Sequence, residues 1–412
     1  MDLSYRIDGS SKFGSDKRFA PFWSAGIGWN LHNEKFLREN KVFNSLRLKA
    51  SYGITGSQDF STESTNTTYQ YLSSSRYVGW SSATMMGLGN TELTWQQTKQ
   101  TNVGLEFGMW KNRITGQLDV YTKKTSNLLS SMDLPLSTGF SAYTANVGEM
   151  KNSGVEASLN VYLIRNYERR FNWMIGGQFV YDKNEITKLS DAVIKQNEEY
   201  LNQNVEVSNL FYVGKPMNAI YAVRSLGIDP STGNEVYLDK NGEVTNTWNA
   251  SDKVYLGSSQ PRFRGNFHTM LMWKNITLNV SFAYHWGGKM YNTTLRDRVE
   301  VTRNTIGSKN VDSRVLSDRW MNKGDNTFFR NFSDTAIRST SRYVFNDRLL
   351  QMQSVSLQYR WNSKWLQSAT SLESVVFAIN TSDLFHWSSV KLERGTSYPY
   401  ARNIQGSITI TF

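Results

Sequence analysis

Apolar and polar residues alternate with a period of two along much of the chain, which places successive side chains on opposite faces of a strand. From Val103 to Met109 the odd-numbered residues are apolar, and the residues between them are glycine or glutamate. A short turn at Lys111–Asn112 follows, and the alternation resumes from Ile114 to Val120. The two stretches therefore predict a β-hairpin with one apolar face.

The same pattern recurs from one end of the chain to the other. With the hairpin, it predicts about twelve strands, and many of them approach the roughly 9 to 11 residues that cross a bilayer at a tilt. The further stretches are roughly Leu3–Ser11, Phe19–Leu31, Leu46–Ser57, Gly154–Leu163, Phe171–Asp182, Arg262–Trp273, Ile276–Tyr284, Leu349–Trp361, Ser374–Thr381 and Gln405–Phe412.

The connections between these strands alternate in length. Short or compact turns are expected near Asn33–Asn44, Lys111–Asn112, Asn166–Arg169, Lys274–Asn275 and Asn362–Glu373. Long polar segments separate them, at Gln58–Asn90, Leu128–Ala145, Lys183–Gln260, Asn292–Asn346 and Ser382–Ala401. This asymmetry is typical of a transmembrane antiparallel β-barrel, which has short periplasmic turns and long extracellular loops.

Tryptophan supports the same interpretation, because its ring prefers the membrane interface, where it is half buried and its N–H stays hydrated. Five tryptophans each lie within a few residues of a different short turn, and we predict that they form an interfacial girdle: Trp29, Trp110, Trp173, Trp273 and Trp361. The structural alternative is that these rings only pack against neighbouring strand residues.

Composition agrees with an all-β protein, since the chain is 13% aromatic and contains only 6 prolines. The mean hydropathy of -0.51 does not exclude a membrane barrel, whose lipid-facing and lumen-facing residues average out. No apolar run reaches the 18 or so residues of a transmembrane helix. The net charge of +11 is scattered rather than clustered, so we expect no nucleic-acid partner.

Several motifs resemble one family, the SusC/RagA type of TonB-dependent outer-membrane transporters of Bacteroidetes. The most specific are the NTELTWQ block followed by TNVGL, within Gly87–Gly108, and the NSGVE block within Asn146–Leu159. LSYRIDGSSKFG, LRLKASYGITGSQ and DRWMNKGDNT also fit the family, and the strand that closes on Phe412 resembles its assembly signal, for which we name Ile408, Ile410 and Phe412.

The resemblance implies a barrel of about 22 strands filled by an N-terminal plug. Signal peptide, TonB box, plug and first strands have no counterpart here, so we expect residues 1–412 to be the C-terminal half of such a barrel. The family implies localisation in the outer membrane, contact with its lipid, a SusD-like lipoprotein partner and coupling to the TonB complex through the N-terminal part. It implies import of oligosaccharides, peptides or similar nutrients, and no enzymatic activity.

Candidate chemistry is sparse. The four histidines, His32, His268, His285 and His386, lack HExxH spacing, and no Ser/His/Asp arrangement has supporting context, so we predict no catalytic residue and no metal site. The acidic stretch Asp229–Glu243 lacks EF-hand spacing, and its Asn-Gly pair predicts a hairpin with a type I′ turn. We expect no cofactor, with calcium on an extracellular loop as the one candidate.

Aromatic residues in the long segments are the candidates for ligand binding, because aromatic faces suit sugars and peptides. They are Tyr212, Tyr221, Trp248, Tyr255 and Trp320. The alternative is that these rings pack the loops against themselves. Two other functions stay open at this point, a self-contained passive pore and a soluble extracellular glycan-binding β-protein.

Overall fold

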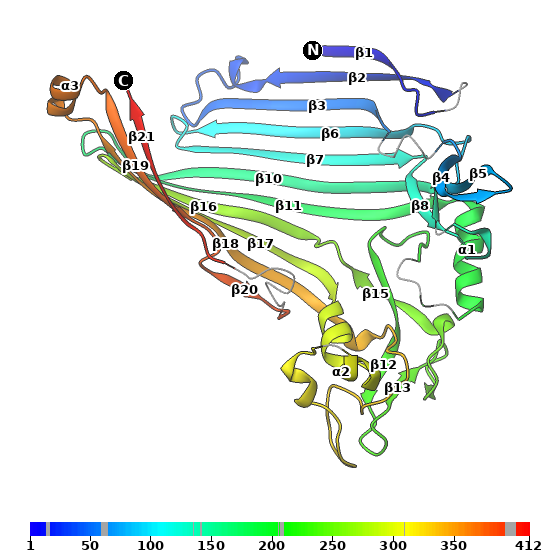
Figure 1. Cartoon of the computed structure of the whole chain (residues 1–412). Coiled ribbons are helices and arrows are strands. Elements are labelled where there is room, and N and C mark those ends of the chain that lie inside the picture. Colours follow the sequence, from blue (N-terminus) through cyan, green and yellow to red (C-terminus); the bar gives the residue numbers. More distant parts are fainter. Residues whose placement is uncertain are drawn as a thin grey trace.

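The computed structural model describes residues 1–13, 17–58, 65–134, 136–140, 142–204, 206, 210–308, 310–391 and 401–412. Its main feature is one large, curved antiparallel sheet (Figure 1). The strand order is β1-β2-β3-β6-β7-β10-β11-β16-β17-β18-β19-β21, with the short β20 beside β18. Sequence neighbours in this order are spatial neighbours, as in an up-and-down barrel wall.

The twelve predicted strands each correspond to one strand of this order. Their bounds are β1 Asp2–Gly9, β2 Phe19–Asn30, β3 Phe43–Ser57, β6 Gln96–Met109, β7 Ile114–Ser126, β10 Gly148–Asn166, β11 Phe171–Leu189, β16 Phe263–Trp273, β17 Ile276–Tyr291, β18 Val344–Trp361, β19 Ser374–Thr381 and β21 Ile404–Thr411; β20 is His386–Ser388.

Several strand bounds differ from the prediction. In particular, β18 begins at Val344, inside the segment predicted as a loop up to Asn346, and β11 continues to Leu189 through the segment predicted as a loop from Lys183 onward. Its last residues, DKNEITKL, carry few apolar side chains on either face. A strand end that stands clear of the membrane has no lipid-facing side, so it loses the alternation that identifies a strand in a sequence.

The apolar faces of neighbouring strands are in register across the whole sheet. Val103 pairs with Val120, and Leu105 pairs with Leu118, between β6 and β7. At the other end of the sheet Phe377 pairs with Ile408 and with Tyr359. A shift of one residue in any pair would turn a strand's apolar side chains to the opposite face, so the register is strongly specified.

These apolar side chains are exposed on the protein. Val120 is 52% exposed, Leu357 46% and Ile379 56%. Ile408 and Ile410 of the last strand share this face and are exposed as well, so they do not pack in an interior. Each such side chain gains roughly 1.5–3 kcal/mol on leaving water. A continuous face of this kind fits hydrocarbon and not water.

The opposite face of the sheet is polar. Lys49 on β3 donates to Glu106 on β6 at 2.6 Å, and Asn102 donates to Asp119 at 3.3 Å. Polar residues at alternate positions, facing away from the apolar side, are what a barrel lumen requires.

The alternation in connection length is confirmed. The compact turns lie together at one end of the sheet, and the long connections lie at the other end (Figure 1). Two compact turns contain short helices, the 3-10 turn Leu31–Asn33 and α3, Lys364–Thr370. The Ser363 hydroxyl accepts from the Leu366 N–H and so caps α3.

The long connections contain secondary structure that the alternation did not predict. Among the described residues these include two small hairpins, a four-stranded sheet of order β14-β13-β12-β15, and the α-helices α1 and α2. Their bounds are β4 Thr68–Tyr77, β5 Trp80–Gly87, β8 Leu129–Asp133, β9 Ala142–Asn146, α1 Asp191–Asn202, β12 Ala219–Ile228, β13 Glu235–Leu238, β14 Val244–Thr245, β15 Lys253–Ser258 and α2 Arg303–Ser308. In the described part of the chain, no helix is long and apolar enough to cross a membrane.

The hairpin predicted at Asn241-Gly242 is present as β13 and β14. Its turn is not type I′, because that turn needs positive φ at both central residues and only Gly242, at +87°, has it. Instead the Asp239 carboxylate accepts from the N–H groups of Asn241 and Glu243 and closes a longer loop.

The NTELTW block anchors the connection before β6 to the sheet. Leu93 is fully buried, and Trp95 packs with Phe13 and Phe22. The Trp95 Nε1–H donates to the carbonyl of Lys17 at 3.0 Å. The specificity of this motif therefore reflects packing at the end of the sheet that carries the long connections.

Candidate ligand site on the long connections

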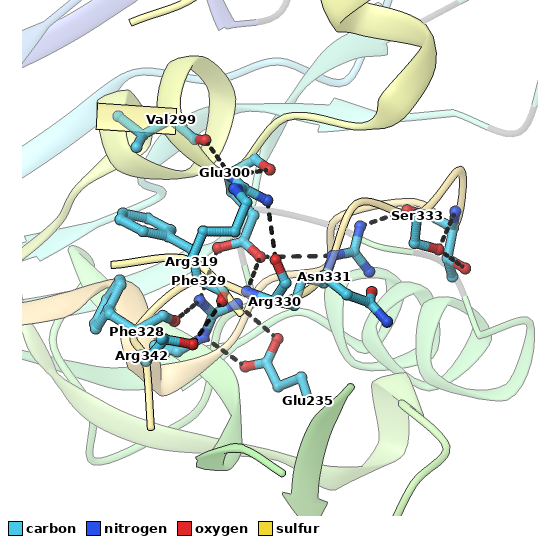
Figure 2. Close-up of polar contacts among 12 residues, drawn as sticks. Glu235, Val299, Glu300, Arg319, Phe328, Phe329, Arg330, Asn331, Ser333 and Arg342 are labelled. Atoms are coloured by element: carbon cyan, nitrogen blue, oxygen red, sulfur yellow. Dashed lines mark hydrogen bonds and ion pairs between the residues drawn. The ribbon is translucent and has the colours of Figure 1, made fainter. Parts of the chain in front are cut away.

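The connection between β17 and β18 is held by a buried group of charged side chains (Figure 2). Arg342 bridges two carboxylates, with Nη2 2.9 Å from Glu235 Oε2 and Nη1 2.7 Å from Glu300 Oε2. Glu300 is fully buried. Burial lowers the pKa of Arg342, but the hydrogen bonds and charges of Glu235 and Glu300 outweigh burial and raise it overall. Because Glu235 belongs to β13, this pair joins the connection to the small sheet.

A second arginine organises the backbone of the same connection. Arg319 donates from Nε to the carbonyl of Val315 at 2.6 Å, and from Nη2 to those of Val299 at 2.6 Å and Glu300 at 3.0 Å. Its Nη1 donates to the carbonyl of Arg330 at 3.0 Å (Figure 2). The guanidinium is buried, which lowers its pKa. One side chain thus satisfies carbonyls that no sheet or helix pairs, so the connection is preformed.

Three of the predicted ligand residues lie together on this framework. The ring of Tyr221 on β12 lies 5.2 Å from that of Tyr212 and 5.9 Å from that of Tyr255 on β15. Lys215 Nζ lies 4.7 Å above the Tyr255 ring. The Tyr221 hydroxyl is buried without a hydrogen-bond partner among the described residues. Burial raises the pKa values of Tyr212 and Tyr221, so both hydroxyls are neutral donors at pH 7.

A polar cavity of about 240 Å³ lies beside the cluster, with Tyr255 in its wall. Its charged walls come from the ends of β11 and β16 and from Lys215, and Gln260 donates to Asp182 at 2.6 Å. Aromatic rings beside amide and charged groups can stack on a ligand and also hydrogen-bond it. The lining residues that the sequence analysis did not name are Asp182, Lys183, Asn184, Gly214, Lys215, Pro216, Ser258, Gln260 and Arg262. The loss of alternation at DKNE was a sequence signal for Asp182, Lys183 and Asn184 alone.

The other two predicted ligand residues lie elsewhere. Trp248 is 8% exposed and packs in a separate core with Val223 and Tyr237, where its Nε1–H donates to the carbonyl of Ser339 at 3.1 Å. Trp320 donates to the carbonyl of Pro230 at 2.9 Å and covers Gly233, whose φ is +71°. Both rings pack loops together, the alternative noted from the sequence.

The five predicted girdle tryptophans all lie at the end of the sheet that carries the compact turns, next to strand ends. Three of them use the indole N–H: Trp29 donates to Glu34 at 2.9 Å, Trp173 to Thr269 at 2.9 Å and Trp361 to Ser363 at 3.1 Å. Trp110 and Trp273 are half exposed. Their placement suits a membrane interface, and the girdle role itself stays a prediction.

The assembly signal and the calcium site also stay predictions. Phe412 lies just beyond β21 and is exposed, next to the exposed Ile410, and nothing in the fold tests an assembly signal. The turn carboxylates proposed for calcium are engaged locally: Asp229 accepts from Ser231 and Thr232, and Asp239 from its own turn.

The outward apolar face, the polar inner face and the loop-bearing end together define the wall of an outer-membrane β-barrel. The chain matches the family described as TonB dependent receptor-like, beta-barrel, over residues 1–299, and it belongs to that family. The resemblance read from the motifs is thereby confirmed, together with localisation in the outer membrane, and the soluble glycan-binding alternative is wrong.

Similar proteins share this assignment. The chain is 28% identical to TonB-dependent receptor P3 of Formosa agariphila over 403 residues, which is 92% of the chain and 38% of that protein. It is 27% identical to TonB-dependent receptor SusC of Bacteroides thetaiotaomicron over 378 residues, covering 88% of the chain and 36% of SusC. The structure of the RagAB peptide transporter matches with a TM-score of 0.78 and 26% identity, covering 94% of the chain and 42% of that one. The chain therefore spans about two fifths of the length of these relatives.

Proposed function

We propose that this chain forms part of the barrel wall and extracellular mouth of a SusC-like TonB-dependent importer of oligosaccharides, peptides or similar nutrients. The observation that carries the proposal is the preformed mouth itself: three tyrosines and a polar cavity, held on a rigid loop framework at one end of a lipid-facing sheet. A passive pore has no need of such a site. The similarity to SusC and to the RagAB peptide transporter supports the proposal.

The sheet itself favours a larger assembly in the membrane. β1 and β21 are the two ends of the strand order, and each pairs on one side within the described residues. Unpaired N–H and C=O groups cost several kcal/mol each in hydrocarbon. We infer that further strands pair with both edges and that the complete barrel houses the plug and the TonB-contacting segment. A SusD-like lipoprotein would rest on the long connections.

Energy coupling separates the importer from the passive pore. We would compare uptake of a tryptic peptide mixture and of a plant-polysaccharide oligosaccharide mixture by the host with and without the gene. The importer hypothesis expects gene-dependent uptake of one mixture that a protonophore abolishes. Gene-dependent uptake that survives the protonophore would instead support the passive pore.

A further inference from the structure

A groove runs along the lipid-facing side of the sheet, on strands β10, β11, β16 and β17. Its lower part has a volume of about 540 Å³ and is lined mainly by apolar groups, among them Leu159, Ile175, Phe179, Phe267 and Phe282. The groove exists because Gly177 of β11 stands between Leu159 and Phe267 in the register and adds no side chain. The missing side chain therefore leaves a depression in the apolar surface.

A second hollow of about 710 Å³ continues the groove toward the long connections, and the two share Phe267 and Tyr284. Aromatic rings follow the groove along β16 and β17. The ring centroids of Phe267 and Phe282 are 4.8 Å apart, those of Tyr284 and Trp286 are 5.2 Å apart, and those of Phe263 and Trp286 are 5.4 Å apart. Trp286 and Trp387 border the upper part, which makes this a second aromatic row, at the opposite end of the sheet from the predicted girdle.

A β-bulge places positive charge at the upper end of the groove. The pairing of β17 with β18 shifts by one residue between His285 and Gly288, and Gly287 there has φ +82°. After the shift, Lys289 pairs with Asn346 and falls on the same side as Trp286. Arg348, two residues from Asn346, also lines the upper hollow and is exposed.

The one acidic residue that borders this hollow is engaged elsewhere. Side chains alternate between the two faces along β18, and that of Asp347 lies on the inner face. There its carboxylate lies 2.9 Å from His285 Nε2. Lys289 Nζ donates to Asn346 at 2.7 Å, an uncharged partner. Among the described residues, the upper end of the groove therefore presents two cations to the outside without a compensating carboxylate.

The height of these cations matches the membrane surface. Lys289 lies 13 residues beyond Ile276, the first residue of β17. At ~3.3 Å per residue and a tilt of about 40°, that places it about 33 Å from the compact turns, whereas the apolar band of such barrels is about 25 Å tall. The apolar part of the groove thus lies at the depth of acyl chains, and Lys289 and Arg348 lie at the depth of headgroups.

We propose that this groove binds a single outer-leaflet lipid with a phosphorylated headgroup, with one acyl chain between Leu159 and Phe267 and a phosphate oxygen between Lys289 and Arg348. The charge pattern selects this occupant, because an acyl chain alone requires no cations and a soluble anion requires no apolar groove. The aromatic rings pack against the chain and exclude water from the phosphate contacts. The inference needs the outer-membrane orientation of the barrel and does not depend on which nutrient it imports.

The test is lipid retention by the protein purified from its own outer membrane in detergent. Native mass spectrometry would follow titration with diphosphoryl lipid A, and with phosphatidylcholine as the lipid without net charge. We expect the wild-type protein to bind one molecule of lipid A with high affinity. Lys289→Gln and Arg348→Gln should each weaken lipid A binding about fivefold, and neither should change the binding of phosphatidylcholine much. The swap Lys289→Arg with Arg348→Lys keeps the charge and should retain affinity.

Two further variants isolate the groove. Ala157→Leu, on the same face, should fill the lower hollow and weaken lipid A about fivefold while leaving the surface apolar. Arg169→Gln with Lys274→Gln removes two cations at the opposite end of the sheet and should leave the affinity unchanged. Equal loss in that control, or wild-type affinity after removal of both groove cations, overturns the proposal. The proposal would also be overturned if the protein were a dimer without bound lipid and Ala157→Leu dissociated that dimer, since the groove would then contact a second copy.

Discussion

Arg342 and Glu300 form an ion pair of 2.7 Å although they are 42 residues apart in the chain. The pair links two distant parts of the connection between β17 and β18. The sheet fixes the two ends of this connection, and the buried ion pair fixes its middle. Removing one partner of such a pair leaves the other charge buried and uncompensated. The geometry of the mouth therefore depends on a small number of charged side chains outside the tyrosine cluster.

Glu300→Gln should unfold this connection locally and spare the barrel wall. Arg342 would then pair with Glu235 alone, and Arg330, whose Nε lies 3.5 Å from Glu300 Oε1, would lose its carboxylate partner. A broken buried pair costs about 3–5 kcal/mol. Hydrogen exchange of the amides in residues 310–343 reports the change, and we expect their protection to fall while that of β6 and β7 stays constant. Asp297→Asn is the matched control, because Arg296 and Asp297 pair at 2.6 Å but the aspartate side chain is 52% exposed. An exposed pair contributes less than about 1 kcal/mol, so comparable losses in both variants would contradict the assignment.

A charge on the outward face should weaken insertion, whereas a charge on the inner face should not. Leu357 on β18 pairs with Leu278 and Ile379 on the apolar face, and Gln358 is its neighbour on the polar face. Leu357→Arg is expected to destabilise the barrel by about 2–4 kcal/mol, as arginine does near the bilayer midplane. Gln358→Arg should change stability by less than about 1 kcal/mol. Urea titration in lipid vesicles measures both, and equal effects would mean that the two faces are not lipid and lumen.

The barrel wall was predictable from the sequence because lipid imposes the alternation directly on each strand. Residues such as Val103 and Val120 had to be apolar in register, and compact turns such as Lys274–Asn275 followed from the distance between strand ends. The mouth was less predictable. Trp248 and Tyr221 are both nearly buried aromatic residues of the long connections. That Trp248 packs beside Val223 and not in the tyrosine cluster depends on contacts with segments as distant as Ser339.

The second aromatic row shows the same limit. Tryptophan at compact turns was visible because those turns are short, so any nearby ring lies close to the membrane surface. At the other end the strands run on past the membrane, and the position of Trp286 relative to the bilayer becomes clear only from the register of β16 and β17. The bulge at Gly287 decides the side on which Lys289 lies, and the Gly287–Gly288 pair does not by itself fix where the register shifts.

Acid should loosen the loop framework through Asp312. The Arg314 side chain and N–H donate to its carboxylate and lower its pKa from 3.8 to about 2. Because the pKa in the folded protein is below the unfolded value, the contribution to stability is complete above about pH 4 and is lost as the pH falls toward 2. We expect it to be about 1 kcal/mol, given the partial exposure of the pair. Hydrogen exchange of residues 312–316 from pH 5 to pH 2 should show the loss in the wild type and a flatter profile in Asp312→Asn. Parallel profiles would exclude Asp312 as the titrating group.

The tyrosines give the most direct test of the mouth. Tyr212 is 37% exposed, and its ring packs at a tilt against that of the nearly buried Tyr221, so Tyr212→Ala removes a ring that a ligand can reach and leaves the framework in place. If the ring stacks on ligand, affinity for the imported mixture should fall about tenfold, which corresponds to the roughly 1–2 kcal/mol of an aromatic contact. Leu316→Ala, another exposed loop residue, is the control and should leave affinity unchanged. Uptake rates at limiting nutrient measure both variants in the host. Tyr212→Phe keeps the ring and should restore uptake. Loss of uptake in Tyr212→Phe would assign the role to the hydroxyl. Wild-type uptake in Tyr212→Ala would remove the three tyrosines from the ligand site.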